Sequence, residues 1–86
     1  MNTLDLTEMT ARVRKLLEGS ALGEVVQDVS IEPVSYEDDE VLRVTIRVRK
    51  PDKVKADDAI AIIRQINDEL SEVDERFASV RFAEAA

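Results

Sequence analysis

The sequence predicts an α+β fold: a two-layer sandwich in which two helices cover one face of a three-stranded, mainly antiparallel sheet. Three observations lead to this prediction. Within the segment 41–50, residues 42–49 alternate strictly between aliphatic and polar side chains, two other segments carry aliphatic residues at helical spacing, and the segments follow one another in the order α-β-β-α-β.

The segment 41–50 is the clearest strand in the chain. Because successive side chains of a strand point to opposite faces, one of its faces is wholly aliphatic and the other carries three guanidinium groups. The aliphatic residues are Leu42, Val44, Ile46 and Val48, and they alternate with Arg43, Thr45, Arg47 and Arg49. One face of the sheet therefore requires a hydrophobic core, and the other is polar.

The first helix is predicted to begin after Asp5, a good N-cap residue, with Glu8 three positions later and Leu4 and Met9 placed as a hydrophobic staple. Gly19 is expected to end it in the left-handed conformation common after helices. The aliphatic stripe of this helix comprises Leu6, Met9, Val13, Leu16 and Leu17.

Residues 24–36 alternate with period two and form a second predicted strand, which the acidic turn 37–40 joins to the strand 41–50. In chain order, 24–36 is the first strand and 41–50 is the second. If Tyr36 faces Val41, then Ile31 faces Ile46, Val29 faces Val48, Asp28 faces Arg49, Ser30 faces Arg47 and Glu32 faces Thr45. Pro33 cannot donate a ladder hydrogen bond, so it should lie at a bulge or where the strand has no neighbour.

The second helix is predicted to start at about Ala56, after a basic loop interrupted by Pro51. Its stripe comprises Ala59, Ile62, Ile63, Ile66, Leu70 and Val73. Ile60 lies off this stripe, which makes it a candidate for a contact outside the core. A short strand over 77–83 closes a single domain spanning 1–86, with 1–4 and 84–86 expected to fray.

Two strand orders satisfy a right-handed crossover from the second strand through the second helix. The third strand lies beside the first in the order 2-1-3, or beside the second as a parallel neighbour in the order 1-2-3. We favour 2-1-3, although Pro33 would prefer the first strand at an edge.

Residue composition argues against an enzyme. The chain has no histidine, the side chain that most readily exchanges protons near neutral pH, and no cysteine for a thiolate site or a disulfide. The acidic turn 37–40 lacks the alternate spacing and the glycine of a calcium loop. We therefore expect no catalytic residues, no cofactor and no metal, and a cytoplasmic protein without a membrane-spanning segment.

Charge is segregated along the chain. The net charge is -7, but residues 41–56 carry six bases against Asp52 alone, whereas the segments on either side are strongly acidic. The basic block can hold an anionic patch of a partner at short range, although the acidic remainder repels nucleic acid at long range. No glycine accompanies the lysines as in a phosphate-binding loop.

The arginine face of the sheet is the leading candidate for partner binding, because Arg offers a planar fork of donors. Alternatively it is only the solvated side of a half-buried sheet, with Asp28 and Glu32 pairing the arginines. The candidate partner-binding residues are Arg43, Arg47, Arg49, Lys50, Lys53, Lys55, Tyr36 and Ile60.

These observations favour a non-enzymatic, acidic protein-protein interaction module, such as an accessory subunit or an antitoxin-like neutralising partner. The alternative is nucleic-acid or anion binding through the basic patch 43–55. A core with few aromatic residues and a sheet with one open face form a marginal unit, so we also expect a homodimer that uses the sheet or the Ile60 flank.

Overall fold

The computed structural model describes residues 5–85, so the predicted contact of Leu4 lies outside the described residues. The elements are α1 (Leu6–Glu18), β1 (Val26–Tyr36), β2 (Asp39–Val48), a 3-10 turn η1 (Pro51–Lys53), α2 (Ala56–Ser71) and β3 (Phe77–Glu84). Their order is the predicted α-β-β-α-β.

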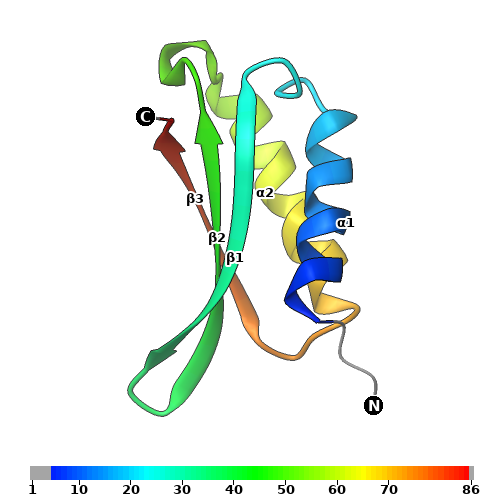
Figure 1. Cartoon of the computed structure of the whole chain (residues 1–86), viewed down its shortest axis with the longest axis vertical. Coiled ribbons are helices and arrows are strands. Elements are labelled where there is room, and N and C mark those ends of the chain that lie inside the picture. Colours follow the sequence, from blue (N-terminus) through cyan, green and yellow to red (C-terminus); the bar gives the residue numbers. More distant parts are fainter. Residues whose placement is uncertain (1–4, 86) are drawn as a thin grey trace.

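The two helices and the three strands form separate layers, as Figure 1 shows. Helix α1 packs on β1, helix α2 packs on β3, and the helices contact each other. The opposite face of the sheet has no covering layer of helix or strand within residues 5–85. The predicted two-layer α+β architecture is therefore confirmed.

The strand order is β1-β2-β3, with β1 and β2 antiparallel and β2 and β3 parallel. Our preference for 2-1-3 was wrong, because the crossover through α2 returns the chain to the far side of β2. This order leaves β1 at an edge, where Pro33 needs no hydrogen-bonding neighbour on one side. The argument from Pro33 was the better guide.

The hairpin register differs from the predicted one by two residues. Ile31 pairs with Val44, Asp28 with Arg47 and Glu32 with Arg43, because Glu37 and Asp38 alone form the turn. Glu37 adopts a positive φ of 52°, which permits this tight connection. A shift of two leaves each side chain on its predicted face and changes only its cross-strand partner.

The start of α1 agrees with the sequence, and the helix ends at Gly19 as predicted, but the conformation of this glycine differs from the expected one. The Asp5 carboxylate accepts a hydrogen bond from the Glu8 backbone N–H at 2.8 Å, as expected for an N-cap. Gly19 follows the helix with φ -87°, so the predicted left-handed conformation is wrong. The Gly19 N–H still donates to the Lys15 carbonyl at 3.2 Å, which satisfies the last turn.

The core lies between the two layers and is entirely aliphatic apart from Met9. It unites the inner faces of β1 and β2 with the stripes of both helices, as the alternation and the helical spacing predict. Its buried residues are Met9, Val13, Leu17, Leu22, Val29, Ile31, Leu42, Val44, Ile46, Val48, Ile62, Ile66, Leu70 and Ala78.

The last strand is longer than expected. β3 extends to Glu84, and the Ala85 N–H that follows it donates to the Val48 carbonyl at 2.8 Å. Among residues 5–85, no helix is both long and apolar enough to cross a membrane.

Candidate functional site

The uncovered face of the sheet, here called the open face, collects side chains from all three strands. Strand alternation and the observed register place them in rows across β1, β2 and β3. The open face comprises Asp28, Ser30, Glu32, Val34 and Tyr36 of β1, Val41, Arg43, Thr45 and Arg47 of β2, and Phe77, Ser79, Arg81 and Ala83 of β3.

Arg43, a predicted partner-binding residue, has partners within the chain. Its Nη1 lies 3.8 Å from Glu32 Oε1, and its Nη2 donates to the Tyr36 hydroxyl at 2.7 Å. The predicted site residues Arg43 and Tyr36 are therefore brought together, as members of one hydrogen-bonded group.

Arg47 is also paired. Its Nη1 lies 3.5 Å from Asp28 Oδ2 and donates to Ser30 Oγ at 3.3 Å, while Arg14 of α1 reaches Asp28 Oδ1 at 3.2 Å. These groups are largely exposed, so each ion pair contributes about 0 to 1 kcal/mol. The carboxylates nevertheless neutralise the arginine face, as the solvated-sheet interpretation expects.

One end of the open face is apolar. Phe77 is 68% exposed and Tyr36 is 53% exposed, and Val34 and Val41 lie half-buried between them. Val41 pairs with Val34 on one side and with Phe77 on the other, so these three residues form a row across the three strands. Tyr36 lies next to this row, two residues after Val34 on the same face of β1. We call these four residues the apolar end.

Sequence reasoning missed Phe77 as a surface residue of this site. The alternation of β3 already indicates that Phe77 and Ala78 point to opposite faces, and Ala78 belongs to the core. What it does not indicate is that Phe77 lies beside Val41, because that contact depends on β3 being the neighbour of β2.

Next to the apolar end, Arg76 connects β3 with the hairpin. It donates to both carboxylate oxygens of Asp74 and also reaches Glu40 Oε1 at 3.3 Å. The hydrogen bonds from Arg76 hold the pKa of Asp74 below its ordinary value, because they favour the carboxylate more than burial disfavours it. This group fixes the geometry of the α2-β3 connection.

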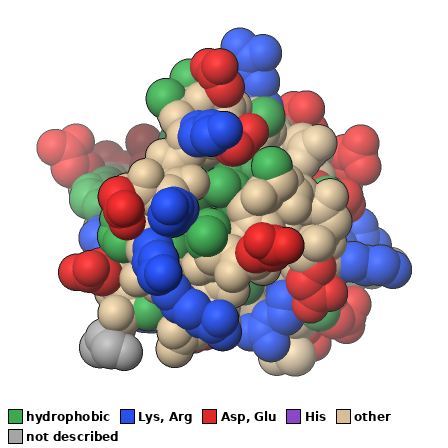
Figure 2. All heavy atoms as spheres, turned by 90° about the horizontal axis from the view of Figure 1, so that it is seen from above, with side chains coloured by type: hydrophobic (Ala, Val, Ile, Leu, Met, Phe, Trp, Pro, Cys, Tyr) green, Lys and Arg blue, Asp and Glu red, His purple; other side chains and the backbone are tan. Residues whose placement is uncertain are grey.

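The basic loop, defined as Arg49, Lys50, Lys53 and Lys55, lies at the opposite end of the molecule. All four residues are exposed, and none of them forms an ion pair within residues 5–85. Figure 2 looks down on this end and shows Lys and Arg side chains interspersed with Asp and Glu side chains. The loop is therefore separate from the apolar end and is not a purely cationic surface.

Ile60 lies in the other layer, on α2, with 54% of its surface exposed. The predicted site residues therefore fall into three places: the open face, the basic loop and the outer flank of α2. Within residues 5–85 no cluster of acidic, histidine or cysteine side chains has the arrangement of a metal site.

Comparison with known proteins supports the fold. No family model matches the chain, and no curated protein matches it either. Among solved structures, the chain is similar to the MamB CTD magnetosome protein of Desulfamplus magnetovallimortis BW-1, with a TM-score of 0.57 and 17% sequence identity. The match covers 92% of this chain and 95% of that one, so the likeness extends over the whole α-β-β-α-β arrangement.

Proposed function

We propose that the chain is a non-enzymatic protein-protein interaction module that binds its partner through the open face of the sheet. Its size and acidity suit an accessory subunit or an antitoxin-like neutralising partner. The observation that carries the proposal is the exposure of Phe77 and Tyr36 beside Val34 and Val41, on a face that no helix within residues 5–85 covers.

The apolar end supplies the driving force. Burying a large side chain such as that of Phe77 contributes about 1.5 to 3 kcal/mol, and an aromatic ring with a polar tip, such as Tyr36, suits the centre of an interface. The paired arginines lie beside this end, where they form a polar rim. Because Glu32 and Asp28 already neutralise them, they contribute to specificity more than to affinity.

A second copy of the chain is the simplest partner, because a two-fold axis presents the apolar end to itself. Three strands spaced about 4.8 Å apart, each about 30 Å long, give a face of roughly 400 Å². Specific interfaces bury about 800 Å² on each partner. The homodimer is therefore expected to be weak and to depend on protein concentration.

Light scattering over a concentration series tests the dimer. Phe77→Ser should abolish self-association, whereas Ile60→Ser, which removes an exposed apolar side chain from the helical layer, should leave it intact. Because the contact is apolar, added salt should weaken it little. A mass of one chain at every concentration would overturn the dimer, and loss of a dimer in Ile60→Ser alone would place the interface on α2.

Co-purification from the source cells tests the interaction module itself. The natural chain should bring down a partner protein that Phe77→Ser loses and Ile60→Ser retains. A partner that both variants retain would contradict binding through the open face.

Nucleic-acid or anion binding through residues 43–55 has less support. Arg43 and Arg47 already contact carboxylates, and acidic side chains are interspersed with basic ones at the end of the molecule that carries the basic loop. A gel-shift titration at low salt tests this alternative, and binding lost on Lys50→Glu and Lys53→Glu would favour it.

A further inference from the structure

Phe77 is the most exposed large apolar side chain among residues 5–85, at 68%, and it stands between two hollows of the surface. The first, here called the hairpin hollow, lies toward the β1-β2 turn and is bordered by Asp38, Asp39, Glu40, Val41, Glu75 and Phe77. The second lies toward the end of α2, where Asp68 and Glu75 border it. The exposed ring therefore has acidic side chains on both sides.

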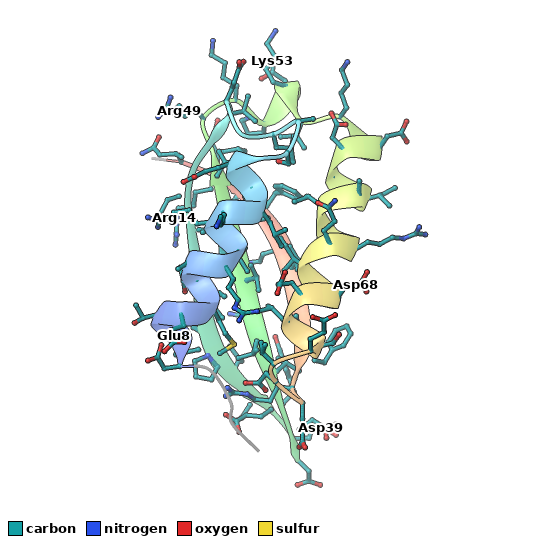
Figure 3. The ribbon with its side chains drawn as sticks, turned by 90° about the vertical axis from the view of Figure 1, so that its right-hand side faces the viewer. Glu8, Arg14, Asp39, Arg49, Lys53 and Asp68 are labelled. Carbon is teal, nitrogen blue, oxygen red and sulfur yellow. The ribbon has the colours of Figure 1, made fainter. Side chains whose placement is uncertain are left out.

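The fold brings these acidic side chains together from separate parts of the chain. Val41 pairs with Phe77, so the acidic turn 37–40 and the α2-β3 connection lie at the same end of the molecule (Figure 1). Figure 3 shows Asp39 at this end, whereas Arg49 and Lys53 lie at the opposite one. The basic loop is therefore too distant to neutralise the carboxylates around the apolar end.

Most of these carboxylates have no counter-ion within the chain. Arg76 is the one basic residue that borders either hollow in the described part of the chain, and Asp74 and Glu40 already accept its hydrogen bonds. Four exposed carboxylates form no ion pair among residues 5–85, namely those of Asp38, Asp39, Asp68 and Glu75. The apolar end is therefore an apolar docking surface with an acidic rim.

We propose that the apolar end binds a basic segment of a partner protein, with an Arg or Lys side chain lying across the Phe77 ring. The aliphatic part of such a side chain covers the ring, and its cation reaches carboxylates of the hairpin hollow such as Asp39 and Glu75. Apolar residues on either side of the cation cover Val41. The inference rests on the proposed role as an interaction module and names the chemistry of its partner.

A second copy of the chain fits this surface less well than a basic segment does. A two-fold axis at the apolar end brings the acidic turns of both copies together, and like charges that face each other weaken the contact. The basic loop of a second copy is a poor source of cations, because acidic side chains are interspersed with it (Figure 2). A basic partner therefore competes with the weak homodimer for the apolar end.

The test is an NMR amide-shift titration of the full chain with the peptide acetyl-Ser-Leu-Arg-Val-Arg-Leu-Ser-amide, at a protein concentration where light scattering gives the mass of one chain. Shifts should appear in the turn 37–40, at Val41 and in residues 75–78. A peptide with citrulline in place of both arginines keeps the shape but loses the charge, and it should bind about fivefold more weakly. Added salt should weaken binding of the Arg peptide and leave the citrulline peptide nearly unchanged.

Neutral variants identify the carboxylates that bind the cations. Asp39→Asn combined with Glu75→Gln should weaken the Arg peptide about fivefold and leave the citrulline peptide unchanged. The matched control is Glu24→Gln combined with Asp52→Asn, which removes the same charge from two exposed residues near Arg49 and should leave both peptides unchanged. Equal weakening of the Arg peptide by the two double variants, or no shift with millimolar Arg peptide, would overturn the proposal.

Phe77→Ser distinguishes this proposal from the proposed function. It should weaken the Arg peptide at least about tenfold, because the cation loses the ring and its apolar contact. Equal binding of both peptides to the natural chain, lost in Phe77→Ser, overturns the basic partner but leaves the open face as an interaction surface. Binding of both peptides that persists in Phe77→Ser contradicts the open face as well.

Discussion

Arg76 donates hydrogen bonds to both carboxylate oxygens of Asp74, from Nε to Oδ1 at 3.0 Å and from Nη2 to Oδ2 at 2.7 Å. The Arg76 backbone N–H also donates to Oδ1 at 2.8 Å. The Asp74 side chain is only 3% exposed, so an acidic residue between α2 and β3 is a structural anchor and not a solvated helix-end charge.

Asp74→Asn should destabilise the fold by about 1 to 2 kcal/mol, because the amide keeps the shape but loses the charge that the guanidinium requires. Urea unfolding followed by circular dichroism measures the change. Asp38→Asn in the exposed hairpin turn is the control, with an expected effect within about 0.5 kcal/mol. Equal effects of the two substitutions would contradict an anchoring role.

The contribution of Asp74 should depend on pH in a defined direction. Its folded pKa lies below the ordinary value of 3.8, so the folded state holds the proton less tightly than the unfolded state. The stabilisation is therefore present above that value and is lost as the pH falls through the folded pKa. The difference in unfolding free energy between the natural chain and Asp74→Asn should be constant from neutral pH to about pH 5 and shrink below about pH 4. A difference that stays constant down to pH 3 would contradict the lowered pKa.

Helix α2 offers a matched pair of isoleucines for testing the core. Ile62 is 1% exposed and Ile60 is 54% exposed in the same helix. Ile62→Ala should cost about 3 kcal/mol of unfolding free energy, a large share of the total for a small domain. Ile60→Ala should stay within about 0.5 kcal/mol, because little buried surface is lost. Thermal unfolding of the two variants measures both effects. A larger loss of stability for Ile60→Ala than for Ile62→Ala would contradict the observed orientation of the helix.

The two glycines after α1 should respond differently to alanine. A Cβ at Gly23 would lie 2.8 Å from the Glu18 carbonyl oxygen and 3.2 Å from that of Leu17, and neither backbone atom can move freely. Gly23→Ala should therefore cost about 1 to 3 kcal/mol. Gly19→Ala meets nothing closer than 3.7 Å and has a negative φ, so it should be tolerated. The urea unfolding midpoints of the two variants measure the two losses of stability. A larger loss for Gly19→Ala than for Gly23→Ala would contradict the observed conformation of the segment between α1 and β1.

Much of the candidate site follows from the sequence. The alternation of residues 41–50 identified the arginine face, and the absence of a third layer identified it as open. The stripe of the second helix correctly set Ile60 apart from the core. Alternation along β3 places Phe77 and Arg81 on the open face, but it could not place them beside Val41 and Thr45, because those neighbours depend on which edge receives β3.

The sequence by itself determined the elements, their order and which residues each buries, because side-chain periodicity and capping are local properties of the chain. Only the tertiary structure decided the strand order and the hairpin register. A register shift of two residues leaves every side chain on the same face of the sheet. The pattern of hydrophobic residues therefore cannot distinguish the predicted register from the observed one. The two-residue turn at Glu37 and Asp38 selects the observed register. The local pattern does not determine the strand order either, because β3 would present the same aliphatic face to the core beside β1 or beside β2. Packing of α2 over the sheet places β3 beside β2 and creates the apolar end at Phe77.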